Sequence, residues 1–246
     1  MTKYVVLALF AGLVLVTAQI KQVTSWDDFR ASRKSQGKTD AEIDAEVSEA
    51  LAALRTMDRN AGDDRLGVTP PPFEFEQWLN SKPLSLENLR GSVVLLRWWT
   101  DTCPLCASTA PALRKLHDQY SSRGLKVIAV YHPKEGLEKP LDLERVQRAV
   151  EARQFSFPVA IDWKWRTLRT WWLSTSPIKR TRPGSDVPRP WRPATSVTLM
   201  LDKNGVIRHV HPGMEYHDGP SSEEHAVCEN DMASIRRAIE RLISEL

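Results

Sequence analysis

Two cysteines, Cys103 and Cys106, lie where a predicted strand becomes a predicted helix. They follow the apolar run at 93–96, and the stretch that contains them reads WWTDTCPLCASTAP. A helix N-terminus presents unpaired N–H groups and a partial positive charge, so it stabilises a thiolate and lowers its pKa. Pro104, between the cysteines, suits the first helical position, because its missing N–H would have no partner there. The spacing therefore predicts a redox-active pair of thiols.

The order of strand, C-x-x-C and proline-containing helix resembles the thioredoxin superfamily, most closely the redoxin and TlpA-like envelope thiol-disulfide oxidoreductases. The resemblance is carried by Trp99, by the pair Cys103 and Cys106, and by Pro111, which in that family kinks the active-site helix. The stretch LSLENLRGS at 84–92 is also similar to the segment before the central strand in TlpA-like proteins. The resemblance implies an α/β thioredoxin-like fold, in which a central mixed sheet is flanked by helices.

The same resemblance implies dithiol exchange that needs no small-molecule cofactor. Cys103 would attack a substrate disulfide as the thiolate, and Cys106 would resolve the mixed disulfide. Thr102 and Pro104 flank the first cysteine and would support it. Because the steps can run backwards, the sequence leaves the direction of the reaction open. The implied partners are protein disulfides or dithiols and a membrane or periplasmic redox protein.

Arg97 departs from the family pattern. It lies six residues before Cys103, where thioredoxins hold a buried acid and TlpA-like proteins usually an asparagine. A guanidinium that points beneath the cysteines would favour the thiolate. A side chain that extends to the surface would have no redox effect. We expect that Arg97→Leu raises the pKa of Cys103 if the first alternative holds.

The second departure concerns the cis-proline that faces the cysteines in this family. Pro193 is the obvious candidate, but it lies twelve residues before Gly205, the glycine of a predicted hairpin, and the family spacing is eight or nine. Either a bulge absorbs the difference, or Thr195 and Ser196 fill the place of the proline. We favour the second alternative.

A thiol peroxidase of the same fold is one alternative function. Peroxiredoxins need P-x-x-x-T-x-x-C, and Thr100 lies at the threonine position relative to Cys103. Leu96 occupies the proline position, so the match is half of the motif.

Copper or zinc handling is a second alternative. Imidazole and thiolate groups suit these metals, and the residues in question lie near the C-terminus: His209, His211, His217, His225 and Cys228. We favour the simpler interpretation of a polar hairpin edge followed by a helix with a buried thiol, and we expect no metal site.

Composition and charge are those of an ordinary globular protein. The 246 residues are 41% hydrophobic and 26% charged, and the net charge is +3. The sequence contains no long basic run, so nucleic acid is not an expected partner. Three cysteines are too few for a disulfide-stapled scaffold.

The chain divides into three predicted parts. Residues 1–20 resemble a signal peptide or an N-terminal membrane anchor, because no charge occurs in 4–20. Both alternatives place the folded part in the cell envelope, outside the cytoplasm. A charged helical extension and linker follows at 21–66, with an amphipathic helix at about 40–58 that begins with a Thr39–Glu42 capping box. The thioredoxin-like domain covers 67–246, with a proline-rich insertion at about 174–192.

Periodicity predicts the elements of this domain. We expect the active-site helix to end near 121, a buried strand at 125–131, a helix at 141–153 and a short strand at 155–161. A tryptophan-rich helix at 163–172, a hairpin at 196–211 and a final helix at about 231–246 would follow. Strands that alternate with helices at this spacing indicate a parallel core.

Overall fold

The computed structural model describes residues 26–56, 60–134, 140–174, 195–219 and 226–245. The predicted leader, most of the proline-rich insertion, Pro193 and His225 lie outside these residues. Within the described part of the chain, no helix is both long and apolar enough to cross a membrane.

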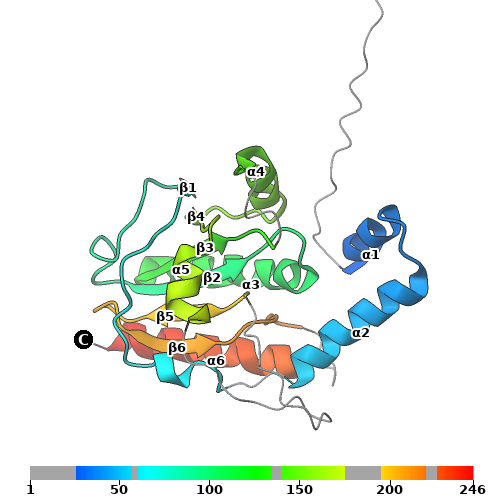
Figure 1. Ribbon diagram of the computed structural model, residues 1–246. Coiled ribbons are helices and arrows are strands. Elements are labelled where there is room, and N and C mark those ends of the chain that lie inside the picture. The colour runs from blue at the N-terminus through cyan, green and yellow to red at the C-terminus, as the bar shows by residue number, and fades with distance from the viewer. Residues whose placement is uncertain (1–25, 57–59, 135–139, 175–194, 220–225, 246) are drawn as a thin grey trace, which may run out of the picture.

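A mixed sheet of six strands forms the centre of the fold (Figure 1). Its order is β1-β4-β3-β2-β5-β6, and β2, β3 and β4 run parallel. The bounds are β1 Gln77–Leu79, β2 Val93–Trp99, β3 Leu125–Tyr131, β4 Val159–Ile161, β5 Thr198–Leu201 and β6 Ile207–His211. The outer strands β1, β5 and β6 pair antiparallel with their neighbours. This is the expected mixed sheet, with β2 near its middle and buried along its whole length.

Alternating residues of β2 face two separate cores, because successive side chains of a strand point to opposite faces. Val93, Leu95 and Trp99 belong to a core with α3 (Pro104–Tyr120), α4 (Leu143–Ala152) and α6 (Ala226–Ser244). The even-numbered residues of β2, Leu96 and Trp98 among them, pack on the other face against α5 (Arg166–Leu168) and the π-helical turn that follows it, Arg169–Leu173. Arg97 occurs in the odd-numbered series and so points toward the face that α3 covers.

The chain turns sharply between β5 and β6. Asp202 Oδ1 accepts hydrogen bonds from the backbone N–H groups of Asn204, at 2.8 Å, and Val206, at 3.0 Å. Gly205 closes the turn with a φ of 71°, a conformation that a glycine adopts at little cost. The predicted hairpin is therefore confirmed, and it places Ser196 and Thr198 beside β2.

Two helices precede the domain and cover one end of it (Figure 1). They are α1 (Trp26–Ser35) and α2 (Asp40–Thr56). The capping box of α2 is present, since the Thr39 N–H donates to Glu42 at 2.8 Å and the Glu42 N–H donates to Thr39 Oγ1 at 3.3 Å. Trp26 and Ala50 pack against the core that contains α3. The extension therefore lies against the folded domain.

Candidate functional site

Cys103 and Cys106 lie at the junction of β2 and α3. Cys103 is the N-cap of α3, and the backbone N–H of Cys106 donates to its Sγ at 3.3 Å. Pro104 occupies the first turn, as predicted, and Pro111 lies inside the helix. Cys103 is 7% exposed and Cys106 4% exposed. The Cys103 sulfur thus accepts a hydrogen bond from a backbone N–H at the start of α3, and this bond stabilises negative charge on that sulfur.

The two thiols are coupled by a hydrogen bond between their sulfurs. This bond lowers the pKa of Cys106 to about 6, against the opposing effect of burial, and the charge of Arg97 adds to the lowering. The same bond, together with burial, raises the pKa of Cys103 well above its ordinary value. The charge of Lys134 acts to lower both pKa values. The pair therefore releases one proton near pH 6 and retains the second, which the sulfurs share.

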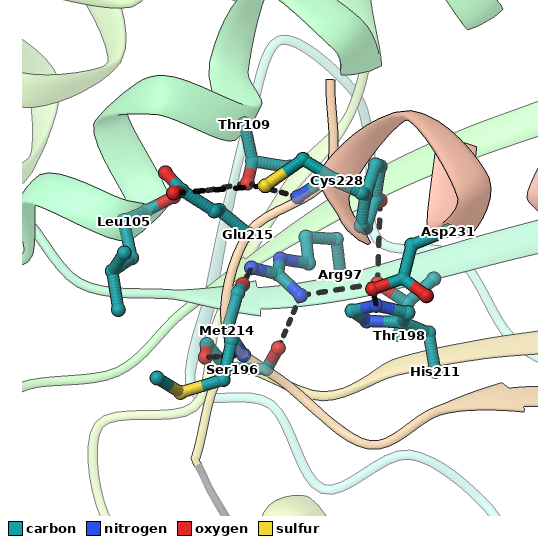
Figure 2. A network of polar contacts seen from close by, with 11 residues as sticks. Arg97, Leu105, Thr109, Ser196, Thr198, His211, Met214, Glu215, Cys228 and Asp231 are labelled. Atoms are coloured by element: carbon teal, nitrogen blue, oxygen red, sulfur yellow. Dashed lines mark hydrogen bonds and ion pairs between the residues drawn. The ribbon is translucent and has the colours of Figure 1, made fainter. Parts of the chain in front are cut away.

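Arg97 is fully buried on the face of β2 that carries α3. Its guanidinium donates to the carbonyl oxygens of Ser196 and Met214 and, at 3.3 Å, to Thr198 Oγ1 (Figure 2). Its charge also lies 5.1 Å from the centre of the Tyr216 ring. Of the two alternatives for this residue, the surface position is wrong. The cation is held by backbone carbonyls from two loops, near enough to the cysteine pair for its charge to act on Cys106.

Asp101, two residues before Cys103, is the centre of a polar cluster that the sequence did not reveal. Arg145 of α4 donates to its carboxylate at 2.6 Å, and the Tyr131 hydroxyl donates at 3.2 Å. Arg153 donates to the Asp101 carbonyl at 3.2 Å, and its guanidinium lies 4.7 Å from the Trp99 ring. Burial lowers the pKa of Arg153. By these contacts, the loop that contains Cys103 is held against α4.

Cys103 lines a pocket of about 740 Å³ between the domain and the N-terminal helices. Thr102, Lys134 and Trp163 contribute from the domain, and Trp26 and Phe29 contribute from α1. Cys106 is absent from the described lining. A substrate sulfur that enters this pocket therefore meets Cys103 first.

Trp26 is expected to restrict access to Cys103, because it lines the pocket and packs against the core. Trp26→Ala should speed the reaction of Cys103 with a bulky maleimide several-fold and leave its reaction with iodoacetamide nearly unchanged. Both rates can be followed by mass spectrometry. Asp27→Ala is the matched control, since Asp27 is exposed on the same helix. Equal acceleration of both reagents, or of neither, would contradict this role.

His132 is a buried histidine close to the site. The residue follows β3 and is fully buried, with its ring 5.1 Å from that of Trp165 and its Nδ1 3.2 Å from the carbonyl oxygen of Pro133. Burial lowers the pKa of His132 from 6.5 to about 4. The ring is therefore neutral in the folded protein at physiological pH.

The His132 ring should make the protein less stable in mild acid. Between pH 6.5 and 4 the unfolded chain gains a proton that the folded chain does not, so folding loses about 3 kcal/mol as the pH falls. Urea unfolding at pH 7 and pH 4.5 measures this, and His132→Leu should show a smaller loss. His117→Gln, a change of a partly exposed histidine, serves as control. An equal loss in His132→Leu and the parent would contradict the assignment.

The remaining predicted residues are distributed around the site. Trp99 is buried, 5.2 Å from the Tyr131 ring. The Ser196 hydroxyl accepts from the Met214 N–H at 3.1 Å, and Thr195 contacts His132 through its backbone. No cis peptide bond occurs among the described residues, and Pro193 lies outside them. Whether Pro193 or the pair Thr195 and Ser196 takes the place of the family's cis-proline stays a prediction.

The described histidines of the metal hypothesis do not form one cluster. His211, on β6, lies 3.0 Å from a carboxylate oxygen of Asp231 (Figure 2). His209 lies on the same strand, and burial lowers its pKa to about 4. His217 and Cys228 lie near each other, and Glu215 is their neighbour.

Known structures of the same architecture define the fold as thioredoxin-like. A Chlorobium tepidum protein described as a thiol:disulfide interchange protein DsbE superposes with a TM-score of 0.51 and 18% identity, over 73% of this chain and 98% of that one. A Bacteroides thetaiotaomicron protein described as a protein disulfide isomerase gives a TM-score of 0.51 and 17% identity, over 74% of this chain and 91% of that one.

Sequence comparison then gives the family. The AhpC/TSA family matches residues 66–210, and the chain belongs to that family. DipZ of Mycobacterium bovis is 27% identical over 193 residues, which cover 74% of this chain but only 25% of DipZ. The thiol-disulfide oxidoreductase ResA of Halalkalibacterium halodurans is 26% identical over 149 residues, which cover 61% of this chain and 69% of ResA.

Proposed function

We propose that the protein exchanges disulfides with protein substrates through Cys103 and Cys106. The observation that carries the proposal is the placement of the pair. One sulfur caps α3 and lines a pocket, and the second lies behind it in the first turn of the helix. The similarity to ResA, named as a thiol-disulfide oxidoreductase, supports the same chemistry.

The proposed reaction begins with the single negative charge that the two sulfurs share. Movement of the shared proton toward Cys106 places this charge on Cys103, where the Cys106 N–H stabilises it. The Cys103 thiolate attacks a substrate disulfide, so that one S–S bond breaks, a mixed disulfide forms and the first substrate thiolate leaves. Cys106 gives up its proton and attacks the Cys103 sulfur, which releases the second substrate thiolate. Two electrons pass to the substrate, and the protein is left with a Cys103–Cys106 disulfide.

The polar groups around the pair have separate roles in this proposal. Arg97 and Lys134 supply positive charge that favours the thiolate. Arg145 and Arg153 hold the Asp101 loop, and through it Cys103, against α4. The first two side chains stabilise the thiolate and the other two position Cys103, and neither role needs a cofactor.

The function is tested by comparing the rates at which the reduced protein reacts with a protein disulfide and with hydrogen peroxide. The reduced protein should reduce insulin disulfides much faster than a Cys103→Ser/Cys106→Ser control, and it should consume hydrogen peroxide no faster than the control. Rapid peroxide consumption with slow insulin reduction would instead establish a peroxidase, for which Thr100, buried three residues before Cys103, is the relevant observation. Equilibration with glutathione gives the reduction potential and so the favoured direction.

We also propose that the domain works in the cell envelope, outside the cytoplasm, and meets a membrane or periplasmic redox partner there. The proposal rests on the uncharged run at 4–20. In intact cells, a maleimide that cannot cross the inner membrane should label Cys103. Labelling that requires cell lysis would refute this location. Fractionation of the cells then distinguishes a cleaved signal from a retained anchor.

A further inference from the structure

A carboxylate, an imidazole and a thiol lie close together outside the Cys103–Cys106 pair. They are Glu215 and His217, in the loop after β6, and Cys228, in the first turn of α6. One ligand atom from each lies within 4.8 Å of the others, and Glu215 and Cys228 are buried. The Cys228 Sγ is 3.8 Å from Glu215 Oε1, and His217 Nε2 is 4.0 Å from Glu215 Oε2 (Figure 2 shows the first pair).

The imidazole of His217 is oriented as a metal ligand would be. Its Nδ1 lies 3.2 Å from the Asp218 carbonyl oxygen, and a carbonyl can only accept, so Nδ1 carries the proton. In the neutral ring the lone pair then lies on Nε2, which faces Glu215 at 4.0 Å. Asp218 is itself fixed by Lys115 of α3, at 2.6 Å, and by Arg236 of α6, at 2.6 and 2.7 Å. Hydrogen bonds of this kind orient ligating histidines in metal proteins.

The donor set and its charge match zinc. Thiolate, imidazole and carboxylate are the three ligand types that Zn²⁺ takes, with bonds of roughly 2.0–2.3 Å that place ligand atoms about 3.3–3.8 Å apart. The Cys228 Sγ to Glu215 Oε1 distance of 3.8 Å already reaches the upper end of this range, and the other pairs, which lie within 4.8 Å, would close by about 1 Å or less on binding. A thiolate and a carboxylate together carry two negative charges, so a bound Zn²⁺ would leave no net charge from these groups in a buried place.

We propose that Glu215, His217 and Cys228 form a zinc site that ties the loop after β6 to the start of α6. Binding replaces the thiol proton of Cys228 by the metal, and the proton leaves to solvent. The loop also reaches the active-site helix, because the Tyr216 N–H donates to Thr109 Oγ1 at 3.3 Å, and it reaches Arg97 through the Met214 carbonyl (Figure 2). The metal thus stabilises the loop that holds the Arg97 cation.

The test uses the full chain with Cys103→Ser and Cys106→Ser, which leaves Cys228 as the only thiol among the three cysteines. Co²⁺ is the spectroscopic probe, and Zn²⁺ is titrated by calorimetry. One Co²⁺ should bind with a thiolate charge-transfer band in the near ultraviolet, and Zn²⁺ should displace it. Zn²⁺ should also raise the midpoint of thermal unfolding by several degrees.

Added Cys228→Ser should abolish the charge-transfer band, and added His217→Gln should weaken Zn²⁺ binding at least tenfold. His209→Gln is the matched control and should bind as the parent does, since His209 lies outside the cluster. Because Cys228 is fully buried, circular dichroism must show that its variant folds. If it does not fold, His217→Gln decides the question, since His217 is only partly buried. The proposal fails if the parent binds neither metal, or if His217→Gln binds Zn²⁺ undiminished.

Discussion

Cys103→Ser is expected to abolish disulfide exchange, by about 10³-fold or more, whereas Cys106→Ser is expected to trap a mixed disulfide with the substrate. The first variant lacks the sulfur that lines the pocket, and a serine hydroxyl is a far weaker nucleophile than a thiolate. The second variant can still attack, but it has no thiol to resolve the intermediate. Insulin reduction measures the first effect, and non-reducing mass spectrometry with a cysteine-containing peptide disulfide detects the second.

The Cys106→Ser variant also tests which of the two sulfurs attacks the substrate. The sulfur bond lowers the pKa of Cys106, but the pocket exposes Cys103. If geometry decides which sulfur attacks, the trapped adduct is on Cys103. Asp118→Ala, at an exposed position of α3, is the control and should exchange disulfides at nearly the parent rate. An adduct trapped on Cys106 in the Cys103→Ser variant, with none in Cys106→Ser, would reverse the two roles.

The elements that carry the site were predictable because local signals agreed there. The apolar run at 93–96 indicated a buried strand, and Pro104 marked the start of the helix that follows it. The Thr39–Glu42 capping box likewise located the start of α2. In each case the apolar periodicity and the capping residues favoured the same structure.

The final helix shows where such signals become weak. It begins at Ala226 and not near 231, because Cys228 and Met232 lie one turn apart on its buried face. The polar residues between them conceal this spacing in the sequence. The tryptophan-rich segment also differs in detail, since it forms a short α-helix and a π-helical turn rather than one regular helix.

The polar surroundings of the cysteines could not be predicted, because they depend on how distant elements dock. Asp101 meets Arg145 and Arg153 only after α4 packs on the sheet. His132 gave no sign of burial, since a single polar residue after a strand has no periodicity to reveal its neighbours. An acidic residue two positions before the first cysteine was the one available signal for the Asp101 cluster.

Arg97→Leu is expected to raise the pH at which the cysteine pair loses its first proton by about one unit, from its present value near 6. The charge of Arg97 lowers the pKa of Cys106, and leucine removes that charge while it remains buried. One unit corresponds to a roughly tenfold slower alkylation at pH values below the midpoint. Iodoacetamide rates measured from pH 4 to 9, with Cys228 replaced by serine, give the midpoint.

The same substitution should also destabilise the fold, by about 2–4 kcal/mol. Leucine cannot donate to the carbonyls of Ser196 and Met214, which the guanidinium now joins, and buried acceptors without donors are costly. Urea unfolding at pH 7 measures this loss.

Arg97→Lys separates the two effects of Arg97, because an ammonium keeps the charge but lacks the planar geometry that spans both carbonyls. We therefore expect the lysine variant to lose stability and to keep a thiolate midpoint close to that of the parent. An unchanged midpoint in a folded Arg97→Leu variant would show that the cation acts only as a structural link. The low pKa would then come from the sulfur–sulfur bond, the charge of Lys134 and the helix N-terminus.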